Sequence, residues 1–243
     1  MPVLLADPSD PDFGLLKAVN GLAAEAPPWL DSLLAWTGEY GVLLGLTALW
    51  LAAWLTARRR PDAPTAIAAV LWAPLGVALT ELANLPVSAI VSRPRPFVDH
   101  PELDVLVGGK EGTLSFVSDH SAMSMAVAVA LLLVDRRLGV AAGALAVLQG
   151  FCRLFVGVHY PTDVLGGYAL ATAVVLLLAP IAMAVLVPLC HAAGRTALRP
   201  LLVAAAPAEG RRPVGRAARR TARSSGSPLR RRGDSNRDSD LAA

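Results

Sequence analysis

The sequence predicts an all-α membrane protein, a polytopic transmembrane helical bundle with about five spans and, as a sixth element, an interfacial helix. Three observations predict this fold. Hydrophobic residues make up 54% of the 243 residues and charged residues only 17%, whereas a soluble domain has about 25% charged residues. The mean hydropathy is +0.51. Five apolar stretches lie near the ~20 residues that a helix needs to cross a bilayer. These features exclude a soluble cytosolic enzyme, a disordered chain and a disulfide scaffold.

The N-terminal region, residues 1–35, precedes the first expected span. It is broken by prolines and has no basic segment before an apolar core, so it does not resemble a cleaved signal peptide. Residues 13–26 are mildly amphipathic, and we expect an interfacial helix there. The transmembrane domain is expected over residues 36–190. Its spans are expected at residues 36–57, 65–91, 119–134, 138–156 and 163–189.

The C-terminal region, residues 191–243, is basic and lacks apolar periodicity. It contains 12 of the 22 Lys and Arg residues but only 4 of the 19 acidic residues. We expect a disordered cytoplasmic tail near anionic lipid, with no nucleic-acid partner. With five spans, Arg58–Arg60 and Arg136–Arg137 fall on the same side as this tail. The positive-inside rule therefore predicts a multi-pass protein of the cell membrane whose tail is cytoplasmic.

Three polar clusters interrupt the apolar stretches, and the expected topology brings all three to the extracytoplasmic end of the bundle. They occupy residues 92–97, 115–121 and 152–163. The basic residues at this end depart from the positive-inside pattern, which suggests that they have a function. These residues are Arg93, Arg95, Lys110 and Arg153.

The residue types in the clusters suit metal-free phosphoryl transfer. Arg95 and Arg153 carry planar guanidinium groups that match phosphate oxygens. Ser118 precedes the third span, where it can cap a helix whose free N–H groups would face an anion.

Two histidines and a carboxylate complete this set. Asp163 lies four residues after His159, so it can orient one imidazole nitrogen and leave the other as a nucleophile. A second histidine, His120, can protonate a leaving oxygen.

The three clusters resemble the signature motifs of the type 2 phosphatidic acid phosphatase superfamily, which includes membrane lipid phosphatases and vanadium haloperoxidases. The family pattern is Lys-x6-Arg-Pro, Pro-Ser-Gly-His and Ser-Arg-x5-His-x3-Asp. The corresponding stretches are Ser88-x6-Arg95-Pro96, Val117-Ser118-Asp119-His120 and Cys152-Arg153-x5-His159-x3-Asp163. The resemblance covers about residues 65–190, and its third motif is the most specific.

This resemblance implies a role for each matching residue. His159 would attack phosphorus and form a phosphohistidine, Asp163 would orient it, and His120 would act as the general acid. The phosphate oxygens would be held by Arg95, Arg153 and Ser118, with Arg93 as an auxiliary contact. No metal and no cofactor are implied.

Two departures from the family pattern bear on the substrate. Ser88 stands in place of the family lysine, and Lys110 or Arg93 is a candidate substitute. Asp119 replaces glycine, and Ser-Asp-His is similar to the bacterial branch that acts on undecaprenyl diphosphate. We therefore expect an integral membrane lipid phosphatase that hydrolyses a polyprenyl diphosphate such as undecaprenyl diphosphate. The alternatives are a phosphatidic acid or phosphatidylglycerol phosphate phosphatase, and a catalytically weakened lipid-phosphate binder or transporter.

Overall fold

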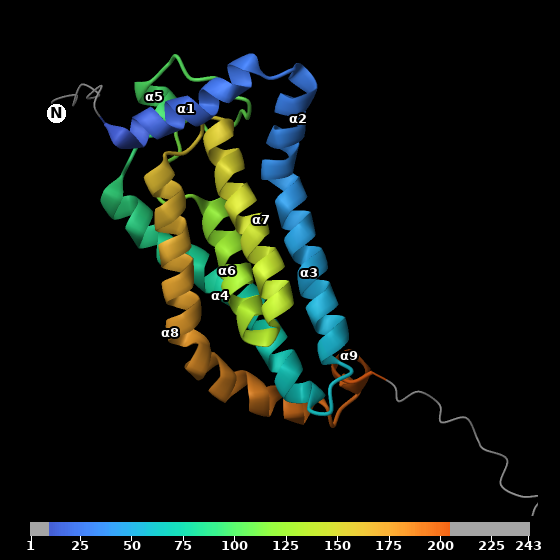
Figure 1. Ribbon diagram of the computed structural model, residues 1–243. Coiled ribbons are helices and arrows are strands. Elements are labelled where there is room, and N and C mark those ends of the chain that lie inside the picture. The colour runs from blue at the N-terminus through green and yellow to red at the C-terminus, as the bar shows by residue number, and fades with distance from the viewer. Residues whose placement is uncertain (1–9, 205–243) are drawn as a thin grey trace, which may run out of the picture. The chain divides into compact units, whose positions relative to one another are not determined.

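The computed structural model describes residues 10–204, and all the regular structure in this part of the chain is helical, with no β-strand. The predicted all-α membrane bundle is confirmed. Figure 1 shows α1 lying across one end of the bundle, while the longer helices run along its length. The elements are α1 (Pro11–Glu25), α2 (Pro28–Trp36), the π-helix η1 (Thr37–Gly41), α3 (Val42–Ala57), α4 (Ala63–Val91), α5 (Pro96–Asp99), α6 (Asp119–Val134), α7 (Arg136–Phe155), α8 (Pro161–Ala193) and α9 (Arg199–Leu202).

Four segments among the described residues are long and apolar enough to cross a membrane. They are Pro28–Ala57, Ala63–Asp99, Arg136–Phe155 and Pro161–Ala193. The third expected span, residues 119–134, corresponds to α6, which is apolar but shorter. The first of the four begins earlier than the predicted residue 36, because α2, η1 and α3 follow one another as a single rod. Pro28 can open this rod because the first helical position needs no backbone N–H donor.

The short helix α6 lies at the centre of the bundle and packs against α3, α4, α7 and α8. Its buried positions are mostly small, which allows the neighbouring helices to approach closely. They include Ser121, Ala122, Ser124, Ala126, Ala128 and Ala130. The N-terminal turn of this central helix therefore lies at the centre of one end of the bundle. The polar clusters were expected at this end.

Ordered structure continues beyond the predicted start of the tail at residue 191. Helix α8 ends at Ala193, and α9 follows with Leu202 buried. Arg58 fixes this segment to the end of α3, because its backbone carbonyl accepts from Ala204 N at 2.9 Å and its guanidinium donates to the Pro200 carbonyl. Residues 191–204 thus differ from the disordered segment expected there, since they include the end of α8 and the helix α9 with its buried Leu202. Residues 205–243 lie outside the described residues.

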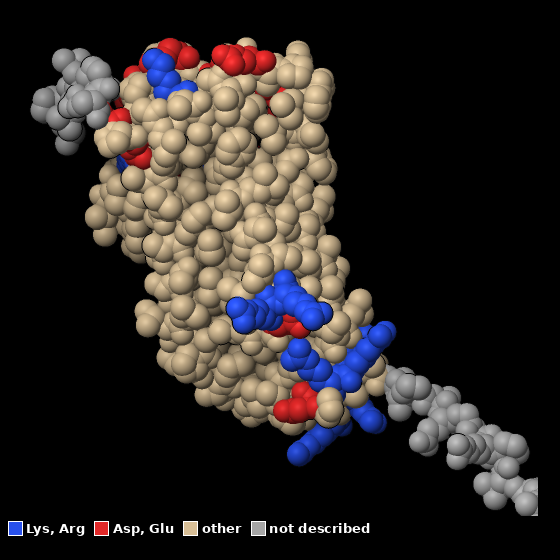
Figure 2. All heavy atoms as spheres, viewed as in Figure 1, with Lys and Arg blue, Asp and Glu red and all other residues tan. Residues whose placement is uncertain are grey.

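Charged side chains gather at the two ends of the bundle. Figure 2 shows Lys and Arg concentrated at the α9 end, and a broad band without charged side chains between the two ends. The basic residues of the α9 end include Arg58, Arg59, Arg60, Arg136, Arg137, Arg195 and Arg199. This distribution is typical of a membrane-spanning bundle with one basic end.

Candidate active site

His159 lies in the tight turn between α7 and α8. The turn depends on Gly157, whose φ of +74° is left-handed and where an added Cβ would lie 2.9 Å from the Asp104 carbonyl oxygen. The buried Asn20 of α1 braces the same turn, because its side-chain amide donates to the carbonyls of Asp104 and Phe155. His159 is thus held on a rigid connection, and it is only 4% exposed.

The ring nitrogens of His159 have different partners. Nδ1 lies 2.9 Å from the Ser115 carbonyl oxygen. A carbonyl can only accept, so Nδ1 carries the proton and Nε2 keeps the lone pair that a nucleophile needs. Nε2 lies 3.1 Å from a guanidinium nitrogen of Arg95. Burial lowers the pKa of His159, and the Asp163 carboxylate partly opposes this shift, so the neutral ring is favoured.

Asp163 is fully buried beside this imidazole, but it does not bond it directly. Its Oδ2 is 3.6 Å from His159 Nδ1, an ion-pair distance. The same oxygen accepts from the backbone N–H of Tyr160 at 2.8 Å, which closes a capping box at the start of α8. The Ser115 carbonyl therefore takes the orienting hydrogen bond that the four-residue spacing had predicted for Asp163, and the carboxylate acts on the ring through its charge.

Arg93 occupies a different place from the auxiliary phosphate contact that was expected. Its guanidinium donates to Asp163 Oδ1 at 3.0 Å and to Asp12 of α1 at 2.7 Å. It also stacks over the ring of Tyr160, 3.6 Å from the centroid. Two carboxylates and an aromatic face satisfy this cation, so it ties α1 to the start of α8 instead of facing a phosphate.

Arg95 lies directly against the candidate nucleophile. It is 6% exposed, and its Nε donates to Thr113 Oγ1 at 2.7 Å while NH1 donates to the Val158 carbonyl at 3.0 Å. These two bonds orient the guanidinium toward His159 Nε2. A phosphate attacked by Nε2 would lie beside this atom.

Arg153, His120, Lys110 and Glu39 form a second group, which we call the phosphate cage. Arg153 is fully buried, and its NH1 donates to Glu39 Oε2 at 3.0 Å. Glu39 Oε1 lies 3.4 Å from Lys110 Nζ and 3.8 Å from His120 Nε2. Among residues 10–204, the buried Nε and NH2 atoms of Arg153 find no hydrogen-bond partner. Buried donors of this kind call for an acceptor, and a phosphate supplies several.

The cage and the His159 group form one site. Thr113 accepts from Arg95 and donates to the carbonyl of Lys110 at 2.7 Å. His120 lies within electrostatic range of Arg153 and His159. Residues from five separate segments therefore converge at the α1 end of the bundle.

Comparison with known proteins identifies this arrangement. Residues 69–186 match the PAP2 superfamily, the type 2 phosphatidic acid phosphatases. Undecaprenyl-diphosphatase BcrC of Bacillus subtilis is 30% identical over 163 residues, which cover 66% of this chain and 78% of that protein. The chain belongs to the PAP2 superfamily. Decaprenylphosphoryl-5-phosphoribose phosphatase of Mycolicibacterium smegmatis is 35% identical over 159 residues, covering 59% of this chain and 84% of that protein.

The fold comparison agrees with this assignment. The crystal structure of a transmembrane PAP2-type phosphatidylglycerolphosphate phosphatase from Bacillus subtilis superposes with a TM-score of 0.50 at 25% identity. The similarity covers 71% of this chain and 87% of that structure.

The second PAP2 motif lies at the start of α6. Ser118 is the N-cap residue, as predicted, but its hydroxyl makes no capping bond and instead accepts from Ser121 at 3.1 Å. Its backbone N–H donates to the Asp163 carbonyl at 3.1 Å. Asp119, which replaces the family glycine, turns to α4 and accepts from Asn84 at 2.8 Å. This hydrogen bond ties the Asp119 carboxylate to α4.

Ser88 is smaller than the family lysine that it replaces. Ser88 lines a cavity of about 570 Å³ together with Arg95, Lys110 and Asp119. Of the two candidate substitutes, Lys110 is the one that reaches the cage, because Arg93 is held by Asp12 and Asp163. Within the described residues, no three His, Cys, Asp or Glu side chains are grouped as metal ligands.

Glu39 is the member of the site that sequence reasoning missed. It lay inside an expected span, and a carboxylate in an apolar span is a recognised sign of function. This carboxylate is the signal in the sequence that could have identified the residue. Thr113 lies in a loop without periodicity, and no pattern marks it.

Proposed function

We propose that this protein is an integral membrane phosphatase that removes the terminal phosphate of a polyprenyl diphosphate. The observation that carries the proposal is the convergence of Arg95, Arg153, His120 and His159 at one end of a transmembrane bundle. The similarity to undecaprenyl-diphosphatase BcrC supports a diphosphate of an undecaprenyl-type lipid.

The reaction follows from the ring orientation of His159. Nε2 attacks the terminal phosphorus in line, and the bond from this phosphorus to the bridging oxygen breaks. His120 donates a proton to that oxygen, which leaves as the lipid monophosphate. Water then attacks the phosphohistidine and gives a proton to His120, which the first step left neutral; the N–P bond breaks, and inorganic phosphate leaves. Arg95 and Arg153 stabilise the charge on the equatorial oxygens in both steps.

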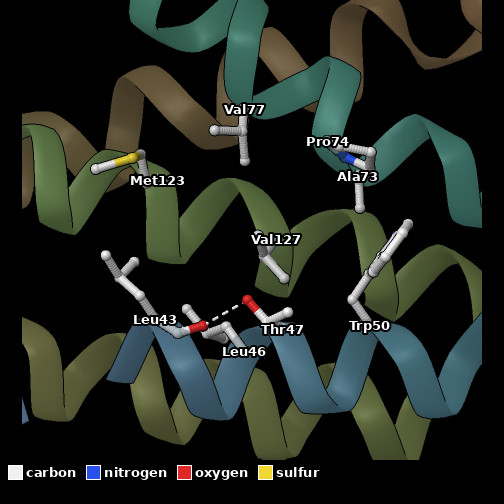
Figure 3. A pocket seen from close by; sticks show the side chains of 9 residues that line it. All are labelled: Leu43, Leu46, Thr47, Trp50, Ala73, Pro74, Val77, Met123 and Val127. Atoms are coloured by element: carbon white, nitrogen blue, oxygen red, sulfur yellow. Dashed lines mark hydrogen bonds between the residues drawn. The ribbon is translucent and has the colours of Figure 1, made fainter. Parts of the chain in front are cut away.

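An apolar cavity beside the cage supports a substrate with a hydrocarbon chain. It has a volume of about 350 Å³ and lies between α3, α4 and α6 (Figure 3). Leu43 follows Glu39 by one helical turn, and Met123 follows His120 by one turn, so the cavity continues the helix faces that carry the cage. The one hydroxyl in its lining, Thr47, donates to the Leu43 carbonyl within α3. A prenyl chain suits such a wall.

The charge distribution supports an extracytoplasmic site. The basic α9 end opposes the end where α7 joins α8, the turn that holds His159 (Figures 1 and 2). By the positive-inside rule the α9 end faces the cytoplasm, so the site would act on lipid in the outer leaflet. This location fits the recycling of a carrier lipid at the cell membrane.

A substrate panel tests the proposal. Phosphate release by the purified full chain would be measured with prenyl diphosphates, phosphatidic acid and phosphatidylglycerol phosphate, with EDTA present. We expect the highest kcat/KM for a prenyl diphosphate and a loss of at least ~10³-fold in His159→Ala. His191→Ala is a matched control, because His191 is half exposed at the opposite end of the bundle. Equal release by wild type and His159→Ala would contradict catalysis and leave a lipid-phosphate binder.

The same panel addresses the second candidate. The structural similarity to a phosphatidylglycerolphosphate phosphatase favours a glycerophospholipid substrate. A higher kcat/KM for phosphatidylglycerol phosphate than for every prenyl diphosphate would replace the polyprenyl assignment while retaining the phosphatase activity.

A further inference from the structure

The carboxylate of Glu39 lies among the cationic groups that we assign to phosphate. It accepts from Arg153 at 3.0 Å, and its other oxygen lies 3.4 Å from Lys110 and 3.8 Å from His120. The Glu39 side chain is 21% exposed, whereas that of Arg153 is 1% exposed. An anionic group of this chain thus already contacts the donors that a substrate would need.

The backbone around Glu39 is fixed in place. The residue belongs to η1, and single-turn π segments are frequent at functional sites. Gly38 packs so closely on α7 that an added Cβ would lie 2.6 Å from the Cys152 Cβ and 2.7 Å from Arg153 NH2. The fully buried Gln149 donates to the Gly38 carbonyl at 2.7 Å. These contacts hold the Glu39 backbone beside Arg153.

Glu39 satisfies Arg153 only in part. It takes NH1, whereas Nε and NH2 remain buried without a partner in the described part of the chain. A carboxylate offers two oxygens and one negative charge. A phosphate group offers more oxygens and up to two charges, so it can take the same donor and the two free ones. The geometry therefore allows a phosphate to displace Glu39.

We propose that Glu39 is an internal competitor for the phosphate site, a residue that sets the affinity of the site for phosphate. The proposal rests on the proposed phosphatase function for its biological meaning. In the resting protein the carboxylate holds Arg153 and Lys110, and the substrate phosphate displaces it. After hydrolysis, its return to these cations promotes release of inorganic phosphate.

The test measures binding of inorganic phosphate to the purified full chain, from the phosphate-dependent rise in melting temperature. We expect Glu39→Gln to bind phosphate roughly tenfold more tightly than wild type, because the competing charge-assisted bond is lost. Glu111→Gln is the matched control. It removes the same charge from the exposed residue next to Lys110, and its affinity should equal that of wild type.

A second variant separates contact from distant charge. Glu39→Asp keeps the charge but shortens the side chain, so we expect phosphate affinity between those of wild type and Glu39→Gln. It also provides a readout if Glu39→Gln does not fold. Wild-type affinity in both Glu39 variants, or weaker binding in either, would overturn the proposal.

Turnover provides an independent check on the role of Glu39. Glu39→Gln should strengthen product inhibition by inorganic phosphate, because the carboxylate that competes for Arg153 and Lys110 is lost. A fall of more than ~100-fold in kcat with unchanged phosphate affinity would assign Glu39 to the chemistry and overturn competition. The binding comparison needs no substrate, so it decides the proposal even if no lipid is hydrolysed.

Discussion

At the scale of single residues, the protonation of His159 is decisive for the proposed chemistry. The Ser115 carbonyl holds the proton on Nδ1, and burial lowers the pKa of the ring. Three nearby charges influence it: Arg95 and Arg153 favour the neutral form, and Asp163 favours the charged form. The environment thus keeps Nε2 unprotonated, so it can attack without a separate base once a phosphate takes the Arg95 donor that lies 3.1 Å from it.

This protonation predicts a pH dependence. The ordinary pKa of histidine is about 6.5, and a histidine with a lowered pKa becomes protonated only below that pH. Activity should therefore be retained at about pH 6.5 and be lost only at a lower pH, where Nε2 takes up a proton. We expect the acid limb of kcat/KM against pH to lie below this value. Asp163→Asn removes the opposing carboxylate, so its acid limb should move to still lower pH. An acid limb above pH 6.5 in the wild type would contradict a neutral buried nucleophile.

The sequence predicted most of these residues but not all their contacts. The spacing of His159 and Asp163 indicated that the two lie side by side, and they do. It could not indicate the Ser115 carbonyl, because a backbone oxygen in an irregular loop leaves no trace in residue type. Likewise, residue type alone does not show whether Arg93 or Lys110 is the better substitute for the family lysine. Only the fold shows that Asp12 of α1 holds the arginine.

At the scale of elements, α1 is a brace for the active-site turn. The fully paired side-chain amide of Asn20 bonds the carbonyls of Asp104 and Phe155, and its oxygen accepts from Asp104 N at 2.9 Å. Asp12 adds a second attachment, since it accepts from Thr162 N at 2.9 Å. The helix therefore joins the loop before α6 to both ends of the α7–α8 turn.

Removal of the Asn20 amide tests this bracing role. Asn20→Ala removes three hydrogen bonds to the backbone, of which the one to the Phe155 carbonyl is buried, so we expect a loss of about 1–3 kcal/mol in stability. Thermal unfolding in detergent should show a lower melting temperature and reduced kcat. The adjacent Gly21→Ala is the control, because it is exposed and has open space around it, and it should be neutral or stabilising. An unchanged melting temperature in Asn20→Ala would contradict the bracing role.

The helices themselves were predictable because apolar length is a strong signal. Their ends were less so. The polar residues Asp31 and Ser32 interrupt the apolar run before residue 36, which hid the true start of the first span at Pro28. The short α9 depends on packing against α4 and α8 and on hydrogen bonds to Arg58, tertiary contacts that composition does not reveal.

At the scale of the whole molecule, the separation of charge sets the orientation that we propose. Arginines cluster where α9 meets the turns between α3 and α4 and between α6 and α7 (Figures 1 and 2). The candidate site lies at the other end. This separation was already visible in the sequence, because the arginines fall at alternate loops.

Topology reporters test this orientation. A reporter fused after Ala243 or inserted at Asp62 should report the cytoplasm, and one inserted at Gly109 should report the exterior. The physical reason is the cost of moving clustered arginines across the membrane. The reverse pattern would place the site at the inner leaflet and remove the carrier-recycling proposal.

The central claim is that His159 forms a covalent bond to phosphorus, and trapping that bond tests it most directly. The full chain would be mixed with a prenyl diphosphate, quenched rapidly under alkaline conditions and digested for mass spectrometry. We expect one phosphoryl group on His159 in the wild type and in His191→Ala. A phosphoryl group on another residue, or full activity in His159→Ala, would contradict the account.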